Sequence, residues 1–139
     1  MSPELSASLE DYLEAIYHLE REERVARVRD IAARLRVQMP SVTGALRSLA
    51  SKDLVNHTPY SYVTLTPAGE RIAREMVRRH DVLTGFLSDF LGLDRAVAER
   101  NACAMEHAIE AQVLDRLVEF VQGARERPGP GPHAREARG

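Results

Sequence analysis

The segment that most restricts the possible folds is residues 27–65, where two short amphipathic stretches precede two β-prone runs. Residues 28–35 have the apolar spacing of a short helix that buries one face. A second helix is expected over residues 40–49, because Pro40 is tolerated at the first helical position, where an N–H has no intrahelical partner. Two short helices joined by a turn at residues 36–39 predict a helix-turn-helix, although an ordinary helical hairpin has the same pattern.

Two β-prone runs, residues 54–57 and 62–65, flank the sequence Thr-Pro-Tyr-Ser and predict a β-hairpin. A hairpin directly after a helix-turn-helix is the wing of a winged DNA-binding domain, so it favours that domain over an ordinary helical hairpin. The wing contains no Arg or Lys, and Tyr60 and Ser61 are its candidate phosphate contacts. The expected DNA-binding residues combine small or polar side chains near the second helix with basic and aromatic ones: Gln38, Pro40, Ser41, Thr43, Arg47, Lys52 and Tyr60.

The charge distribution also favours a polyanion as partner. The net charge is only −2, but residues 24–80 carry eleven basic and four acidic residues. Residues 1–23 carry one Arg and seven acids, and residues 81–123 carry three basic and eight acidic residues. A basic block between acidic blocks predicts a surface for a polyanion joined to surfaces for cations. Uneven solvation of an ordinary protein surface is the alternative.

The rest of the chain is mostly helical by the spacing of its apolar residues. A first helix is expected over residues 5–22 and a long one over residues 67–91. Helical sequence resumes over residues 94–122, with a predicted break near residues 108–110. A strong apolar stripe over residues 113–121 predicts a homodimer, which would bury that surface.

These elements predict a mainly α fold with an N-terminal winged helix-turn-helix domain followed by a helical dimerisation domain. The expected DNA-binding domain is residues 1–66, and the helical metal-binding and dimerisation domain is residues 67–123. Residues 124–139 are expected to form a disordered tail, because alternating Pro and Gly cannot hold a helix or a sheet. The sequence has no apolar run that could span a membrane and no signal-peptide pattern. A single Cys cannot form an internal disulfide, so the expected location is the cytoplasm.

Three side chains that commonly bind metals occur together at Cys103, Glu106 and His107. Their spacing of three and four residues is expected to place them on one face of a helix. A thiolate, a carboxylate and an imidazole suit a first-row transition metal, and the alternative is a surface Glu and His beside a buried Cys. Glu99, one turn before Cys103, is either a ligand of a second ion or a solvated acid.

Further candidate ligands occur on two other predicted helices. Asp11 and Glu14 are three residues apart and lie on one flank of the first helix. Acids near a helix N-terminus also compensate the helix dipole, which is the alternative reading of this pair. His80 lies on the apolar stripe of the long helix, where a satisfied core histidine is the alternative.

With these residues in this order, the chain resembles the DtxR/MntR family of metal-dependent transcriptional repressors over about residues 5–122. The likeness is most specific in three short sequences: residues 10–17, Arg79-His80 with Phe86-Leu87 after it, and Glu106-His107. The resemblance implies a metal site of the manganese-branch type, in which five ligands match and Cys103 stands at the position of the sixth. That ligand set is Asp11, Glu14, His80, Cys103, Glu106 and His107.

The identity of the metal is less directly implied. The manganese branch has a Glu at the position of Cys103, and a Cys there is similar to the iron-responsive branch. That branch has a Met at the position of Asp11, however, and its second site uses a Glu and a His where this chain has Thr84 and Glu99. The resemblance implies Mn(II) or Fe(II), with the carboxylates of Asp11 and Glu14 favouring Mn(II). Co(II) and Zn(II) are expected to bind in vitro, because Zn(II) binds tightly to most such sites.

The implied function is metal-dependent repression of metal-ion uptake genes, with Mn(II) as corepressor. A homodimer is expected to bind double-stranded DNA at a near-palindromic operator, and no enzymatic activity is expected. An Fe(II)-responsive repressor of the same family is one alternative, and a winged-helix regulator that senses redox state through Cys103 is another. A small metalloenzyme is the third alternative, because a site of Cys, Glu and His with an open position can activate water.

Overall fold

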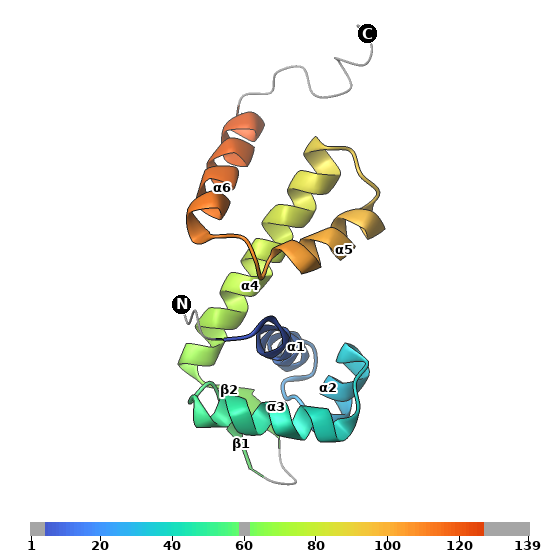
Figure 1. Cartoon of the computed structure of the whole chain (residues 1–139), viewed down its shortest axis with the longest axis vertical. Coiled ribbons are helices and arrows are strands. Elements are labelled where there is room, and N and C mark those ends of the chain that lie inside the picture. Colours follow the sequence, from blue (N-terminus) through green and yellow to red (C-terminus); the bar gives the residue numbers. More distant parts are fainter. Residues whose placement is uncertain (1–4, 59–61, 127–139) are drawn as a thin grey trace, which may run out of the picture. The chain divides into compact units, whose positions relative to one another are not determined.

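The computed structural model describes residues 5–58 and 62–126 of the 139-residue chain. In chain order its elements are α1 (Ala7–Glu23), α2 (Val28–Leu35), α3 (Met39–Ser51), β1 (Val55–His57), β2 (Val63–Leu65), α4 (Pro67–Gly85), the π-helix η1 (Phe86–Phe90), α5 (Arg95–Met105) and α6 (Ala111–Glu126) (Figure 1). The chain divides into two compact units, residues 1–77 and 78–139, and the boundary between them lies within α4. The mainly α fold predicted from the sequence is therefore confirmed.

The first helix of the N-terminal unit begins at a serine cap. The Ser6 hydroxyl accepts a hydrogen bond from the backbone N–H of Leu9 at 3.2 Å, which satisfies one of the donors that open a helix. The helix ends at Arg24, which adopts the left-handed backbone conformation with φ of 73°. The prediction of a helix over residues 5–22 is confirmed with a shift of one or two residues at each end.

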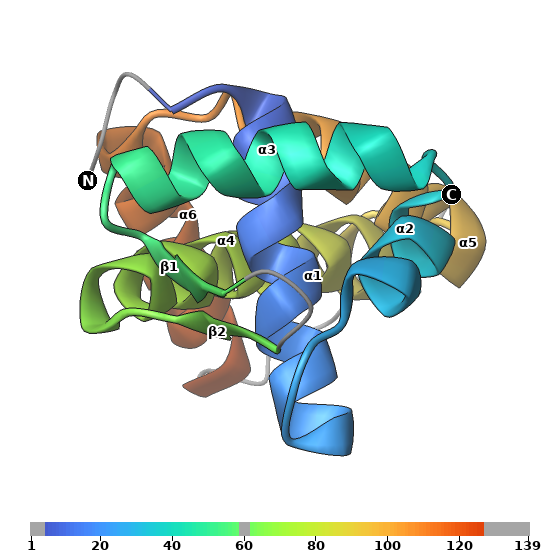
Figure 2. The ribbon, with the colours of Figure 1, turned by 90° about the horizontal axis from the view of Figure 1, so that it is seen from below.

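The helix-turn-helix is also confirmed, with one correction at its second helix. The first helix, α2, has the predicted bounds, but α3 begins at Met39 and ends at Ser51. Pro40 is therefore the second residue of α3 rather than the first, which is tolerated because the first four N–H groups of a helix have no intrahelical acceptor. Figure 2 shows α3 crossing α1, with the β-hairpin following α3.

The predicted wing is present as a two-stranded antiparallel hairpin. Val55 pairs with Leu65, and His57 pairs with Val63. Val63 also bridges to Ala26, with the Val63 N–H donating to the Ala26 carbonyl at 2.8 Å, so the hairpin is joined to the residues just before α2. The tip of the wing at residues 59–61, which includes Tyr60 and Ser61, lies outside the described residues.

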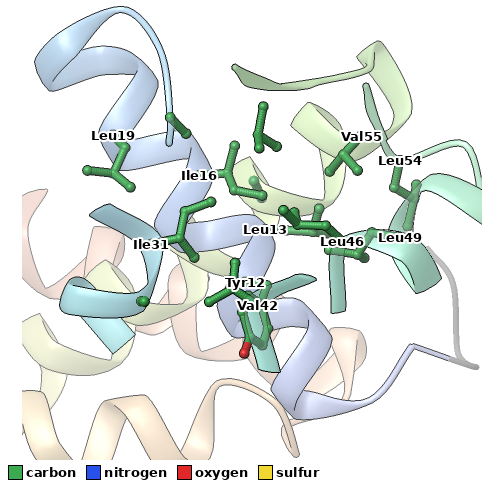
Figure 3. Packing of buried hydrophobic residues seen from close by; sticks show 14 of the residues in the cluster. Tyr12, Leu13, Ile16, Leu19, Ile31, Val42, Leu46, Leu49, Leu54 and Val55 are labelled. Atoms are coloured by element: carbon green, nitrogen blue, oxygen red, sulfur yellow. The ribbon is translucent and has the colours of Figure 1, made fainter. Parts of the chain in front are cut away.

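The three helices and the hairpin of this unit share one apolar core. Its buried side chains come from all three helices and the hairpin, and Figure 3 shows how several of them converge: Leu13 and Ile16 from α1, Ile31 from α2, Val42, Leu46 and Leu49 from α3, and Val55 from β1. Because this core fixes the inner face of α3, it also fixes which side chains of α3 point to solvent.

A carboxylate joins the wing to α1. The Glu20 side chain accepts a hydrogen bond from the backbone N–H of Leu65 in β2 at 3.0 Å. Burial raises the pKa of Glu20 above its ordinary value of 4.5; the hydrogen bond from Leu65 opposes this shift, and the charge of Glu70 adds to it. The folded protein therefore binds this proton more tightly than the unfolded chain does.

Replacement of Glu20 by Gln is expected to raise stability slightly at neutral pH. The stability that comes from protonated Glu20 is complete below the unfolded pKa and is lost as pH rises through the folded pKa. Gln keeps an oxygen for the Leu65 N–H and carries no charge, so this loss should disappear. The effect should be small because the carboxylate is partly solvated. Urea midpoints of the variant and the parent, compared across this pH range with the exposed Glu22→Gln as control, test it. A Glu20→Gln protein less stable than its parent at neutral pH would contradict the assigned cause.

The C-terminal unit contains the end of α4, η1, α5 and α6. Leu83, Leu87, Ala98 and Ala102 form its buried apolar cluster. The helical stretch predicted to end near Leu91 does end there, but its last turn is the π-helix η1, and Gly92 leaves it with φ of +70°, a conformation that favours glycine.

Two boundaries of this unit differ from the predictions. The break between α5 and α6 covers residues 106–110 rather than 108–110. Helix α6 continues to Glu126, whereas a disordered tail was predicted from residue 124. Arg125 pairs with Asp89 at 3.3 Å, and the Pro-Gly alternation starts only at Pro128, so nothing stops the helix at Gly123. Residues 127–139 lie outside the described residues.

Within the described residues, no helix combines the length and apolar character that crossing a membrane requires.

Candidate metal centre and DNA-binding surface

The outer face of α3 carries the side chains predicted to contact DNA. Val42, Leu46 and Leu49 are buried, which leaves the opposite side of the helix in solvent. The predicted residues in the described part of the chain are all exposed: Gln38, Pro40, Ser41, Thr43, Arg47 and Lys52. The Thr43 hydroxyl donates to the Met39 carbonyl at 3.2 Å, a weak intrahelical bond that a DNA acceptor could replace. Contact of these residues with DNA stays a prediction.

The structure adds a basic group beside the wing that the sequence reasoning missed. The guanidinium of Arg27 lies 5.3 Å from the ring centre of Tyr62, a cation–π contact at the N-cap of α2. Tyr62 is half exposed and directly precedes β2. The two residues are 35 positions apart, so no local sequence signal could have paired them. The wing therefore has a cation next to it although its own sequence contains none.

Met39 is a second missed residue of this surface. It opens α3 and is 51% exposed, which is unusual for a large apolar side chain. Its position at the start of the helix, beside Pro40, is where base-edge contacts are made in helix-turn-helix proteins. The position of Met39 directly before Pro40 was the available signal, but the sequence reasoning assigned Met39 to the turn.

The N-terminal unit supplies two candidate metal ligands on α1. Asp11 and Glu14 are both half-buried, and an oxygen of one carboxylate lies within 4.8 Å of an oxygen of the other. Buried residues Tyr12 and Leu13 lie between them in the sequence and face the core. Two acids held this close on one helix flank raise each other's electrostatic energy, and a cation relieves that repulsion.

The C-terminal unit brings together two further candidates. His80 Nδ1 lies 3.3 Å from Glu106 Oε1, and the Glu106 side chain is fully buried while that of His80 is 28% exposed. His80 comes from α4 and Glu106 from the residue that caps α5, so 26 positions of sequence separate them. His80 is therefore paired with a carboxylate, as a satisfied core histidine also would be, and its role as a metal ligand stays a prediction.

The Cys103, Glu106 and His107 triplet is not arranged as predicted. Helix α5 ends at Met105, Glu106 is its C-cap, and His107 lies in the turn that follows. Cys103 is exposed, whereas Glu106 is fully buried. The expectation of one shared helical face is wrong because the helix ends inside the triplet. The alternative of a buried Cys beside a surface Glu is wrong as well, and a ligand role for Cys103 stays a prediction.

Glu99 has a simpler role than that of a ligand. Its carboxylate accepts from Arg95 Nε at 3.2 Å, an exposed i,i+4 ion pair along α5. The solvated-acid reading of Glu99 is therefore the one that the structure favours.

The donor set fits a hard or borderline divalent cation. The N-terminal unit offers the carboxylates of Asp11 and Glu14, and the C-terminal unit offers the carboxylate of Glu106 and the imidazoles of His80 and His107; Mn(II) and Fe(II) accept ligands of both kinds. A fully buried carboxylate such as Glu106 is costly unless positive charge compensates it. The imidazole of His80 lies 3.3 Å from this carboxylate, and a cation at this place is compatible with its chemistry.

Two family models match almost the whole chain. Residues 4–63 match the N-terminal DNA-binding domain of the iron-dependent repressors. Residues 66–134 match the iron-dependent repressor metal-binding and dimerisation domain. The helix-turn-helix, α2 and α3, lies within the first match, and the His80–Glu106 pair lies within the second.

Curated relatives and solved structures agree with these matches. The chain is 40% identical over 114 residues to the transcriptional regulator MntR of Salmonella typhimurium, covering 82% of this chain and 72% of that one. It is 35% identical over 119 residues to an uncharacterised HTH-type transcriptional regulator of Methanocaldococcus jannaschii, covering 85% of this chain and 95% of that one. A solved manganese-dependent transcriptional repressor in complex with manganese is 30% identical with a TM-score of 0.76, covering 82% of this chain and 52% of that one.

The chain thus spans about half the length of that solved repressor and most of the length of the two curated relatives. The relatives are transcriptional regulators and not enzymes, which removes the metalloenzyme alternative. By the two domain matches and these identities, the chain belongs to the iron-dependent repressor family, the DtxR/MntR family of metal-dependent DNA-binding transcriptional regulators.

Proposed function

We propose that this protein is a repressor of metal-ion uptake genes that Mn(II) activates as corepressor. The observation that carries the proposal is the fully buried Glu106 carboxylate beside His80, in the part of the chain that matches a metal-binding domain. Residues 1–66 would act as the DNA-binding domain and residues 67–123 as the metal-binding and dimerisation domain. The cytoplasm is the expected location.

The proposed switch depends on ligands that belong to different parts of the chain. Asp11 and Glu14 lie on α1, the helix whose inner face supports the helix-turn-helix. The other proposed ligands belong to the C-terminal unit, where Cys103 is exposed: His80, Cys103, Glu106 and His107. A divalent cation supplies positive charge that both groups of ligands can share. When they share it, the orientation of α3 becomes coupled to the dimerisation domain.

A homodimer with a near-palindromic operator is the second part of the proposal. Helix α6 exposes Phe120 and Val113, which are 58% and 51% accessible, and Phe120 contacts the rings of Phe86 and Phe90. Exposed apolar side chains of this size favour burial against another copy of the chain. Two copies present two α3 helices, and fixing the separation of those helices selects two half-sites of the operator.

Manganese is preferred over iron because three of the six proposed ligands are carboxylates and only Cys103 offers a thiolate. Mn(II) favours oxygen ligands, and a thiolate would shift the preference toward Fe(II), Co(II) or Zn(II). The exposure of Cys103 weakens the argument for the iron branch, but an Fe(II)-responsive repressor remains the second candidate. Zn(II) is expected to bind in vitro, so affinity alone does not identify the physiological ion.

Metal-titrated DNA binding tests the proposal. Fluorescence anisotropy with duplex DNA from the protein's own promoter region should show binding about 5–150-fold tighter in Mn(II) than in chelator, the usual size of an allosteric coupling. Anaerobic Fe(II), Co(II) and Zn(II) are compared in parallel, and Cys103→Ser serves as the control for redox sensing. Equal affinity in chelator and in every metal would refute the corepressor. Loss of the response in Cys103→Ser, without any metal effect, would favour the redox regulator.

A further inference from the structure

We propose that Arg79 is a positioning residue of the metal centre, which holds the ligand turn, residues 106–110, against α4. The inference rests on the proposed function, because it assigns a role at the same centre. Arg79 directly precedes the candidate ligand His80. One turn of α4 would therefore carry a ligand and also the guanidinium that positions two further ligands, Glu106 and His107.

The geometry of Arg79 is specific. The residue is only 4% exposed, and its Nη1 donates to two backbone carbonyls of the ligand turn, that of Glu106 at 3.1 Å and that of Ile109 at 2.9 Å. Of the two candidate ligands in this turn, Glu106 itself provides one of the bonded carbonyls, and His107 lies between the two bonded residues in the sequence. One guanidinium therefore fixes the backbone on either side of His107 and at Glu106 itself.

The chemistry explains why an arginine suits this place. Helix α5 ends at Met105, so carbonyls near its end lack intrahelical donors. A cation at a helix C-terminus satisfies such carbonyls and interacts favourably with the helix dipole. Charge-assisted hydrogen bonds are short and strong, and the planar fork of arginine holds two acceptors in a fixed geometry that a lysine ammonium does not impose.

Arg79 is a positioning residue and not a ligand, because a guanidinium carries positive charge and has no lone pair to offer a cation. Its effect on metal binding would pass through the backbone of the ligand turn to the side chains of Glu106 and His107. Groups that orient metal ligands in this indirect way commonly change metal affinity by about 10–100-fold when they are lost. The neighbouring Arg78 makes a useful comparison, since it is exposed and pairs with Asp115 of α6 at 3.5 Å.

The experiment compares Arg79→Gln and Arg79→Lys with the control Arg78→Gln in the full-length chain. Mn(II) binding is measured directly, by loss of the free-ion electron paramagnetic resonance signal, and DNA affinity is measured at saturating Mn(II). Arg79→Gln should weaken Mn(II) binding by about 10–100-fold, and Arg79→Lys should give an intermediate loss. Arg78→Gln should remain near the parent value. At saturating Mn(II) all three should bind the operator as the parent does, since the α3 surface is unchanged.

The outcomes separate this inference from the proposed function. Unchanged Mn(II) affinity in both Arg79 variants would overturn the positioning role, while a parent protein that does not respond to Mn(II) would overturn the proposed function instead. If Arg79→Gln fails to fold, Arg79→Lys decides the question. Equal losses in Arg79→Gln and Arg78→Gln, each of which removes one positive charge, would show a general charge effect and would also overturn the inference.

Discussion

Replacement of Glu106 by Gln is expected to abolish metal-stimulated DNA binding while the protein stays folded. Gln has nearly the same shape as Glu and keeps an oxygen for His80, so the buried contact at 3.3 Å can persist. It lacks the negative charge that makes the carboxylate a ligand for Mn(II) or Fe(II). The gain of about 5–150-fold in operator affinity on adding metal should fall to no gain. Anisotropy titrations with and without chelator measure it.

The corresponding change in the N-terminal unit is Asp11→Asn, which should also abolish metal-stimulated DNA binding. Both variants should keep the DNA affinity that the parent shows in chelator, because neither touches the exposed face of α3. The control is Glu119→Gln, which removes the same charge from an exposed acid of α6 that is not a candidate ligand. Metal stimulation that survives in both Glu106→Gln and Asp11→Asn would refute the assigned ligand set.

Replacement of Gly69 by Ala is expected to destabilise the N-terminal unit severely. A Cβ at Gly69 would collide with the backbone carbonyl oxygen of Leu54, which is not a flexible side-chain end and cannot move aside. The Thr66 hydroxyl links this part of α4 to the residues before β1. It accepts a hydrogen bond from the Gly69 N–H at 3.1 Å and donates one to the Asp53 carbonyl at 2.8 Å. Overpacking of this kind costs about 1–3 kcal/mol.

Thermal unfolding followed by circular dichroism checks this prediction, with a fall in Tm on the order of 4–8 °C for each kcal/mol lost. Gly44→Ala is the matched control, because Gly44 lies within α3 and an added Cβ there meets no atom within 4 Å. Alanine is a better helix former than glycine by up to about 1 kcal/mol, so Gly44→Ala should hold or raise the Tm. Equal falls in the two variants would contradict the proposed collision.

The sequence alone predicted the elements whose signals are local. The bounds of α2 were predicted without error, because eight residues with helical apolar spacing lie between clear breaks. The hairpin β1–β2 was predicted to within a residue from two β-prone runs around a turn sequence. The start of α3 was missed by one residue, because proline is acceptable at either of the first two helical positions.

The candidate site was predicted less evenly. The sequence showed which residue types could form the site, and its resemblance to the DtxR/MntR family connected them as one ligand set. Which of them are buried was not: the sequence placed Cys103, Glu106 and His107 on one helical face, but α5 ends at Met105 and turns Glu106 inward while Cys103 stays in solvent. The position of a helix end depends on tertiary contacts such as the hydrogen bonds from Arg79 to the backbone after α5. The spacing of apolar residues in the sequence does not reveal such contacts.

The sequence by itself thus determined the order of the elements and the position of the helix-turn-helix, because these follow from spacing within a few residues, and the resemblance to the family connected the candidate ligands. Only the tertiary structure decided that His80 meets Glu106, that Glu20 holds β2 and that Arg27 stacks on Tyr62. Each of these contacts joins residues that are 26 to 45 positions apart in the sequence. These contacts form because packing of the helices and the hairpin brings the paired residues together and orients them. The spacing of residues along the sequence does not specify that packing.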